Sequence, residues 1–295
     1  MNAVVSPVHL NTSTSFSLTL SCPSAAGQVA AMVHFLEQRQ CYIDELSVYD
    51  DKIENRFFAR CIFHGAGATS LSLAQLRNDF ATVAEAHQMS WKLHSSDNRP
   101  RVVIMVSRLD HCLADLLFRW RMQELAMDIV AIVSNHETLA PMAHVHGIPF
   151  HHWPITAATK LQQENRLLSL VEKENVDLVI LARYMQILSS TTTQKLHNKA
   201  INIHHSFLPG FKGARPYHQA FERGVKLIGA TAHFVTEDLD EGPIIEQMVD
   251  RVTHEHSAQQ LQTVGRDMEC QALARAVKAF IEQRVFVSGQ RTIVL

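Results

Sequence analysis

The hydrophobic and polar positions near the start of the chain alternate, then repeat with a longer period. Between residues 16 and 22 every second residue is apolar, which predicts a half-buried strand. Apolar side chains at residues 29–36 recur every three or four positions, the spacing of one helix face. The same reasoning predicts further strands at 42–49, 57–63 and 90–94 and a helix at 73–87. This order, strand–helix–strand–strand–helix–strand, is the ferredoxin-like motif.

A second pattern begins after residues 95–100, where turn-forming residues and a proline predict a linker. Continuous apolar runs now alternate with amphipathic segments. The runs predict strands at 102–106, 129–133 and 178–181, two short strands are expected at 149–153 and 200–204, and the amphipathic segments predict helices at 112–121, 137–146 and 159–174. Strands that are apolar throughout are covered on both faces, so this part of the chain is expected to form a doubly wound, mostly parallel α/β sheet.

The last third of the chain adds three elements to this sheet. Residues 228–234 predict a strand that leads into the acidic turn 237–242. Residues 258–284 predict a long helix, interrupted or bent near Gly265, and a hairpin around residues 288–290 closes the chain.

These patterns divide the sequence into two domains. The expected segments are a flexible leader at 1–14, a small βαββαβ domain at 15–94, the linker at 95–100 and a larger α/β domain at 101–295.

Composition narrows the class of protein. The chain has 295 residues, 46% of them hydrophobic, and a net charge of -2. A slightly negative net charge does not indicate the basic surface that nucleic-acid binding requires. Neither a signal peptide nor an apolar window of membrane-spanning length is found. The five cysteines are odd in number and have no paired spacing, as in reduced cytoplasmic proteins. We therefore expect a cytoplasmic protein without nucleic-acid or membrane partners.

The candidate chemistry lies near two predicted strand ends. Asn202 and His204 are two residues apart on one predicted strand and therefore share a face. Asp240 lies in the acidic turn after the strand 228–234. Taken singly, these residues also fit a strand cap, a core histidine and a solvated turn. Together with the glycine- and proline-containing loop 209–213, they indicate an active site at the carboxyl edge of the sheet.

The spacing of these residues resembles that of a known enzyme family. N-x-H at residues 202–204 and H-F-V-x-E-D-x-D-x-G at residues 233–242 are similar to the motifs of enzymes that use 10-formyltetrahydrofolate. The resemblance implies that Asn202, His204 and Asp240 are catalytic. It also implies a folate-binding set of Met185, Gln186, Ile187, Leu188, Val235, Glu237 and Asp238. The folate is then the substrate, and no further cofactor is implied.

No metal is predicted by the histidines either. They include neighbouring pairs, but no pair has helical ligand spacing with a nearby carboxylate or cysteine partner set.

The small domain resembles an ACT domain, a regulatory module that often binds an amino acid between its first strand and first helix. The resemblance covers residues 15–94 and makes Ser24 and Gly27 a candidate effector site. Gly27 matches a glycine of that family, and Ser24 stands where the family usually has an aspartate. The alternative is that the domain only pairs copies of the chain, so a homo-oligomer is expected.

Within the folate family, the resemblance over nearly the whole chain favours the deformylases. It includes RVVIMVSRLDHCLADLLFRWR at 101–121 and LARYMQILS at 181–189. Transferases acting on a phosphorylated amine have a glycine-rich turn for the phosphate after the first strand of this sheet, whereas the turn 107–111 has no glycine. Water is then the acceptor, and the products are tetrahydrofolate and formate for purine synthesis. The alternatives are a formyltransferase to a small amine and a catalytically idle folate or amino-acid sensor.

The expected roles follow from amide hydrolysis. Asn202 donates to the formyl oxygen, and Asp240 orients a water and takes its proton. His204 shares the oxyanion and helps to deliver a proton to folate N10.

Overall fold

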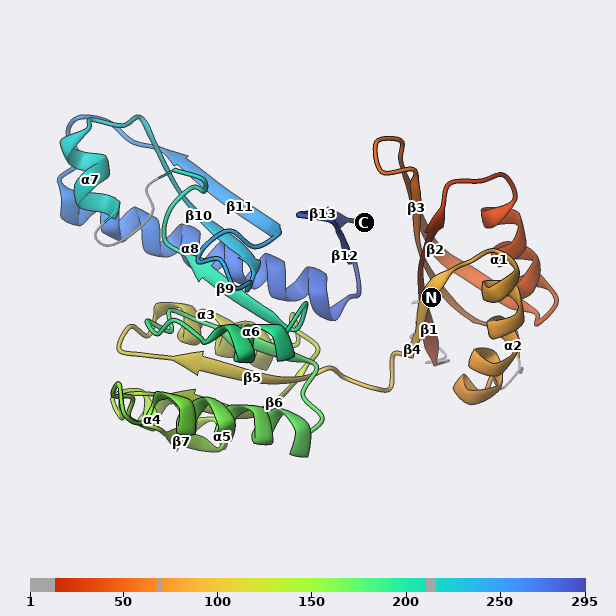
Figure 1. Ribbon diagram of the computed structural model, residues 1–295, viewed down its shortest axis with the longest axis horizontal. Helices are drawn as coiled ribbons and strands as arrows, with labels where there is room; N and C mark the ends of the chain where they lie inside the picture. Colours follow the sequence, from red (N-terminus) through yellow and green to blue (C-terminus); the bar gives the residue numbers. More distant parts are fainter. Residues whose placement is uncertain (1–13, 68–70, 211–215) are drawn as a thin grey trace, which may run out of the picture. The chain divides into compact units, whose positions relative to one another are not determined.

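The computed structural model describes residues 14–67, 71–210 and 216–295 (Figure 1). The chain divides into two compact units, with the boundary between Asn98 and Arg99. Apart from Thr14, the predicted leader lies outside the described residues, as does most of the loop 209–213.

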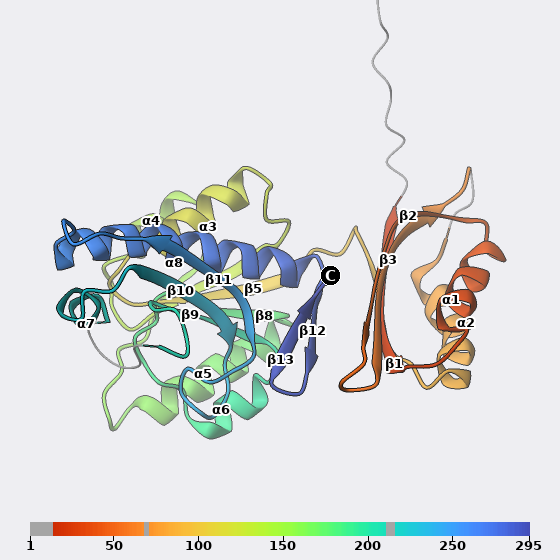
Figure 2. The same cartoon turned by 90° about the horizontal axis from the view of Figure 1, so that it is seen from above.

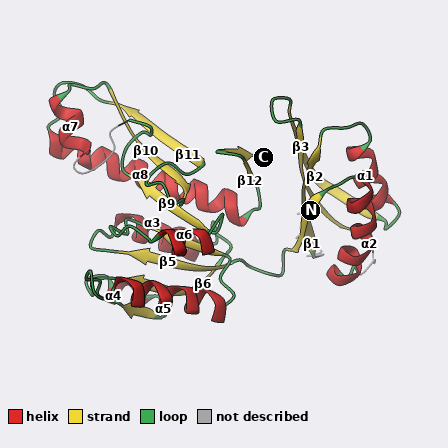
Figure 3. Ribbon diagram, in the orientation of Figure 1, coloured by secondary structure: helices red, strands yellow, loops and turns green. Residues whose placement is uncertain are grey.

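The first unit is a four-stranded antiparallel sheet with both helices on one side (Figure 3). Its elements are β1 (Ser15–Pro23), α1 (Gln28–Glu37), β2 (Cys41–Asp51), β3 (Arg56–Gly65), α2 (Leu73–Ala86) and β4 (Ser90–Ser95). The strands lie in the order β2-β3-β1-β4. This is the predicted βαββαβ arrangement.

Strand β1 shows how the alternation of apolar and polar residues buries one face of this sheet. Its apolar residues Phe16, Leu18 and Leu20 are at most 3% exposed and face the helices. They belong to the same core as Phe35 of α1 and Phe80 of α2, whose rings meet edge-to-face at 5.0 Å. One face of the sheet is thereby buried, as the period of two requires.

The second unit contains a seven-stranded sheet in the order β11-β10-β9-β8-β5-β6-β7, which runs from β11 at one edge to β7 at the other (Figure 1). Its elements are β5 (Arg101–Val106), α3 (His111–Arg121), β6 (Asp128–Ser134), α4 (Ala140–Val145), β7 (Phe150–His152), α5 (Lys160–Lys173), β8 (Leu178–Leu181), α6 (Ser190–Lys195), β9 (Ala200–His204), α7 (Pro216–Glu222), β10 (Leu227–Phe234), β11 (Ile244–Arg251), α8 (Ala258–Ile281), β12 (Val285–Ser288) and β13 (Arg291–Val294). The five strands β9, β8, β5, β6 and β7 pair in parallel. Strands β10 and β11 are antiparallel additions, and β12 and β13 form a separate hairpin.

Helices cover both faces of this sheet, so it is doubly wound as predicted. Val102, Ile104 and Val106 of β5 pack in the core that includes residues of α3, α4, α7 and α8. Val103 and Met105 point to the other face, in the core with α5 and the end of α6. Because β5 is buried on both faces, its sequence is apolar throughout.

The structure differs from the predicted elements in five places. Helices α6 and α7 and strand β11 were not predicted, and α4 begins three residues later than expected. Helix α8 is continuous, so of the two alternatives predicted near Gly265, an interruption or a bend, the interruption is wrong. A Cβ at Gly265 would lie 2.0 Å from the Tyr217 hydroxyl oxygen, so glycine allows the tyrosine of α7 to approach the helix. No helix in the described part of the chain has the length and apolarity needed to cross a membrane.

Candidate active site

Strands β9 and β10 bring the three predicted catalytic residues together. Asn202 and His204 lie on β9, and Asp240 lies in the turn that follows β10. The two strands are antiparallel neighbours, with Asn202 directly opposite His233 of β10 (Figure 2). The site is thus built where the parallel sheet meets its antiparallel extension.

His233 is a fourth polar residue of this site. Its Nδ1 lies 2.8 Å from the Phe234 carbonyl oxygen, which identifies Nδ1 as the protonated nitrogen of the neutral ring. Its Nε2 therefore accepts a hydrogen bond from the Asn202 amide at 3.2 Å. Since His233 is only 2% exposed, it fixes the orientation of the Asn202 side chain.

Asp240 contacts both histidines. One carboxylate oxygen lies 3.2 Å from His204 Nδ1, and the other lies 3.7 Å from His233 Nε2. Burial alone would raise the pKa of Asp240, but its hydrogen bond with His204 and the proximity of His233 outweigh burial and hold the pKa below its usual range. Asp240 is therefore an ionised carboxylate at neutral pH.

The backbone of the turn holds Asp240 in an uncommon conformation. Its φ of 59° lies in the left-handed region, which among non-glycine residues is most accessible to Asp and Asn. A Cβ at Gly242 would lie 1.7 Å from the Phe234 carbonyl oxygen, so only glycine permits this approach of the turn to β10. The glycine of the motif therefore helps to place the carboxylate.

His204 presents its second nitrogen to the site. The ring is 5% exposed, and among the described residues its buried Nε2 has no hydrogen-bond partner. Because Nδ1 faces Asp240, the proton of a neutral ring resides on Nδ1 and leaves the Nε2 lone pair available. An unpartnered buried nitrogen beside an ionised carboxylate is suited to proton transfer.

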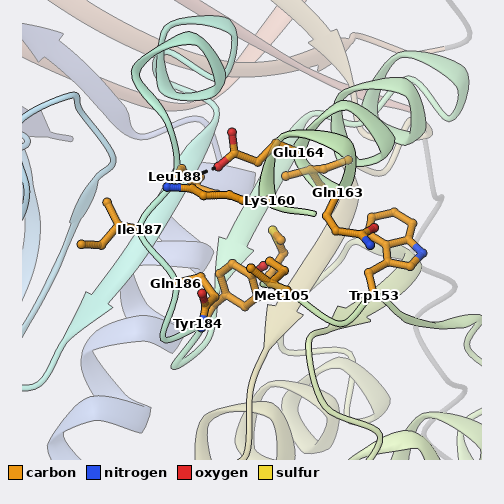
Figure 4. Close-up of a pocket in the computed structure, with 11 residues that line it drawn as sticks. Met105, Trp153, Lys160, Gln163, Glu164, Tyr184, Gln186, Ile187 and Leu188 are labelled. Atoms are coloured by element: carbon orange, nitrogen blue, oxygen red, sulfur yellow. Dashed lines mark ion pairs between the residues drawn. The ribbon is translucent and has the colours of Figure 1, made fainter. Parts of the chain in front are cut away.

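The predicted folate loop, residues 185–188, follows β8. Met185 and Ile187 are 58% and 60% exposed, whereas Leu188 is buried. Figure 4 shows a pocket beside this loop that Gln186, Ile187 and Leu188 line together with residues such as Met105 and Trp153. The loop therefore offers both exposed and buried apolar contacts to a ligand.

Two hydrogen-bonded anchors hold the folate loop in place. The Met185 amide donates to Ser107 Oγ at 3.1 Å. On the other side, Glu164 of α5 is 4% exposed and accepts hydrogen bonds from the amide and hydroxyl of Ser189. Glu164 also accepts a hydrogen bond from the Thr192 hydroxyl at 2.8 Å, and it lines the pocket with Lys160 (Figure 4).

The remaining predicted residues lie in two separate places. Val235, Glu237 and Asp238 are on the segment that leads from β10 to Asp240, and Glu237 accepts a hydrogen bond from Gln194. Ser24 and Gly27 lie in the first unit, between β1 and α1. There the Ser24 hydroxyl donates to Asp50, and Gly27 has a φ of 95°.

One cluster has the composition of a metal site. His111, Cys112 and Glu269 place possible ligand atoms within 4.8 Å of one another. Arg183 Nε, however, lies 3.3 Å from Glu269, and the hydrogen bond with Cys270, followed by burial, raises the pKa of the Cys112 thiol. The carboxylate of Glu269 is thus paired with a cation, and the raised pKa keeps the Cys112 thiol protonated at neutral pH.

Several of these residues were missed by sequence reasoning. His233 had a signal, since it begins the motif at residues 233–242. Glu164 and Glu269 are acidic residues on the buried faces of otherwise amphipathic helices, a pattern that indicates a paired buried charge. Arg183 lies within the segment 181–189, but nothing in the neighbouring sequence predicts its left-handed backbone, with a φ of 61°.

Comparison with known proteins identifies the family of the chain. The family model described as Formyl transferase matches residues 100–277. A formyltetrahydrofolate deformylase from Corynebacterium sp. (strain P-1) is 49% identical, and the match covers 94% of this chain and 97% of the relative.

Two crystal structures of formyltetrahydrofolate deformylases are also similar. The protein from Burkholderia mallei is 63% identical with a TM-score of 0.91, over 95% of this chain and 99% of that one. The protein from Pseudomonas putida is 48% identical with a TM-score of 0.90, over 95% and 100%. With matches of this identity over almost its whole length, the chain belongs to the formyltetrahydrofolate deformylase family.

Proposed function

We propose that this chain hydrolyses 10-formyltetrahydrofolate to formate and tetrahydrofolate at the site formed by Asn202, His204 and Asp240. The observation that carries the proposal is the pairing of His204 with an ionised Asp240, which leaves a buried His204 Nε2 without a partner among the described residues. This is the arrangement of an imidazole oriented by a carboxylate for proton transfer.

The lowered pKa of Asp240 bears on how the roles are divided. A carboxylate that binds protons weakly is a poor base, so His204 Nε2 is the better acceptor for the proton of the attacking water. Asp240 then holds the ring and stabilises its protonated form. This differs from the role expected from sequence, in which Asp240 took the proton.

The reaction then proceeds in two steps. Hydroxide adds to the formyl carbon, and the Asn202 amide donates a hydrogen bond to the oxyanion. The protonated His204 next donates its Nε2 proton to folate N10, the carbon–nitrogen bond breaks, and formic acid leaves and ionises to formate. The folate is held by the loop 185–188 and by Val235, Glu237 and Asp238.

The test is formate release from 10-formyltetrahydrofolate by the purified protein without an added amine. Formate and tetrahydrofolate in equal amounts are expected. Turnover only after addition of a small amine would identify a transferase, and tight folate binding without product would identify a sensor.

We further propose a regulatory role for the first unit, with an amino acid bound at Ser24 and Gly27 and copies of the chain joined as a homo-oligomer. The support is the resemblance of residues 15–94 to ACT domains. Thermal-shift measurements with each amino acid and the molar mass in solution test the two statements separately. A cytoplasmic location, formate supply for purine synthesis and independence from metal complete the proposal.

A further inference from the structure

A buried charge cluster lies beside the catalytic residues but takes no part in the proposed chemistry. It consists of His111, Arg183, Tyr217 and Glu269, here called the Glu269 cluster. Glu269 of α8 is 1% exposed, and Arg183 is 8% exposed. An ionised group buried to this extent requires several partners.

Glu269 has three such partners. One carboxylate oxygen lies 2.7 Å from His111 Nε2 and 3.3 Å from Arg183 Nε, and the other accepts a hydrogen bond from the Tyr217 hydroxyl at 2.8 Å. Burial would raise the pKa of Glu269, but the hydrogen bond with His111 and the charge of Arg183 lower it. The carboxylate is therefore ionised and fully paired.

The three partners come from segments that follow three adjacent strands. His111 begins α3 after β5, Arg183 follows β8, and Tyr217 belongs to α7 after β9. All three strands are parallel, so these segments meet at the carboxyl edge of the sheet. One carboxylate thus ties three active-site segments to a single helix.

The backbone is adapted to this arrangement at two positions. Arg183 adopts a φ of 61°, which is unfavourable for a long side chain without compensation. Gly265 leaves the space on α8 that the Tyr217 hydroxyl group occupies. Two local compromises at the same cluster indicate that its geometry matters for more than core packing.

His205 connects the Glu269 cluster with the catalytic residues. Its ring centroid lies 5.0 Å from that of His204 and 6.2 Å from that of Tyr217. Burial, followed by the charges of Arg183 and His204, lowers the pKa of His205 to about 4. His205 is therefore a neutral ring that packs beside His204 without competing for its proton.

We propose that Glu269 is a positioning residue for hydrolysis, which fixes Arg183 and Tyr217 around His205 and thereby the orientation of His204. The inference rests on the proposed role of His204. The folate loop has its own anchors at Ser107 and Glu164, so Glu269 affects turnover rather than folate binding.

The experiment measures kcat and KM for formate release by Glu269→Gln and Tyr217→Phe. Displacement of catalytic groups by a fraction of an ångström lowers rates by about 10- to 100-fold. We expect a fall in kcat of this size for Glu269→Gln, a smaller fall for Tyr217→Phe, and less than about a threefold change in KM for either. Val277→Ala is the matched control, because it opens the buried face of the same helix outside the cluster.

The outcomes separate this inference from the proposed function. A normal kcat in a folded Glu269→Gln, or a fall in kcat equal to that of an equally destabilised Val277→Ala, overturns the positioning role. If Glu269→Gln does not fold, Tyr217→Phe decides, since it removes one hydroxyl and no charge. Asp240→Asn is measured alongside: its activity, if near normal, overturns the catalytic assignment itself.

Discussion

Asp240→Asn removes the charge at the position proposed to orient His204 while it preserves nearly everything else. Asparagine has the size of aspartate and also favours the left-handed region in which Asp240 lies, at a φ of 59°. Alanine at this position would combine the loss of charge with backbone strain. The substitution therefore isolates the electrostatic and hydrogen-bonding role of the carboxylate.

The expected loss of activity follows from the contact between Asp240 and His204. The carboxylate, 3.2 Å from Nδ1, keeps the proton of the neutral ring on that nitrogen. An asparagine amide facing Nδ1 can donate instead, which moves the ring proton to Nε2 and removes the acceptor for the water proton. Reversal of a catalytic tautomer and loss of a general base each lower kcat by about 100- to 10,000-fold. This range corresponds to about 2.7–5.4 kcal/mol of transition-state stabilisation.

The assay is formate release under single-turnover conditions, with folate affinity measured separately. Asp250→Asn is the control, because it makes the same chemical change on the exposed end of β11. We expect folate affinity within about threefold of the parent for both variants and a loss of turnover only for Asp240→Asn. Near-normal turnover of Asp240→Asn would falsify the division of roles proposed for His204 and Asp240.

The same substitution makes a pH-dependent prediction about stability. Hydrogen bonds to a charged group contribute about 1.5–3 kcal/mol, so Asp240→Asn is expected to lower the free energy of unfolding at pH 7 by about this amount. The pKa of Asp240 is lowered in the folded state, so its contribution is present above the ordinary value of 3.8 and is lost as pH falls toward the folded-state pKa. Urea unfolding of parent and variant should therefore differ most near neutral pH and converge below pH 3.8. A constant difference down to pH 3 would contradict the lowered pKa.

Three further predictions concern the other groups of the site. Asn202→Ala should lower kcat by about 100-fold or more with KM little changed, because it removes an oxyanion donor; an equal rise in KM would instead identify a ground-state contact. Glu164→Gln should raise KM more than it lowers kcat, since it weakens the anchor of Ser189 beside the folate loop, and a pure kcat effect in steady-state kinetics would contradict that function. Dialysis against a chelator should leave formate release unchanged, whereas lost activity restored by one metal would show a metal requirement and make His111, Cys112 and Glu269 its candidate ligands.

The fold was predictable wherever burial imposed a period. Alternating apolar residues predicted β1, and continuous apolar runs predicted the parallel strands β5, β6 and β8. Both patterns follow directly from whether one or both faces of the strand are covered. Helix α6, with the sequence STTTQK, has no apolar stripe and was missed. Its capping residue Ser189 and the buried Glu164 stabilise it through tertiary hydrogen bonds. Such elements depend on partners distant in sequence, which local periodicity cannot reveal.

The candidate site was predictable only where the chemistry lies in a compact motif. Asn202, His204 and Asp240 stand out by residue type and spacing. The pairing of Asn202 with His233 depends on β9 and β10 being sheet neighbours, although a helix separates them in the chain. The contact of Glu269 with Arg183 joins positions 86 residues apart, and neither residue predicts the other. A charge pair between distant positions can be predicted only after the topology of the sheet is known, because the topology decides which side chains meet.

The left-handed conformation of Asp240 also limits which sequences can replace it. Among charged residues, aspartate is the one that this backbone region favours. Glutamate would bring a carboxylate but lacks the local preference for this conformation, and its longer side chain would displace the oxygens that face His204 and His233. Exchange of aspartate for glutamate is therefore expected to keep the charge but lose the contacts with the two histidines. A saturation library at this position should therefore separate into folded inactive and misfolded variants, with aspartate alone in the active class.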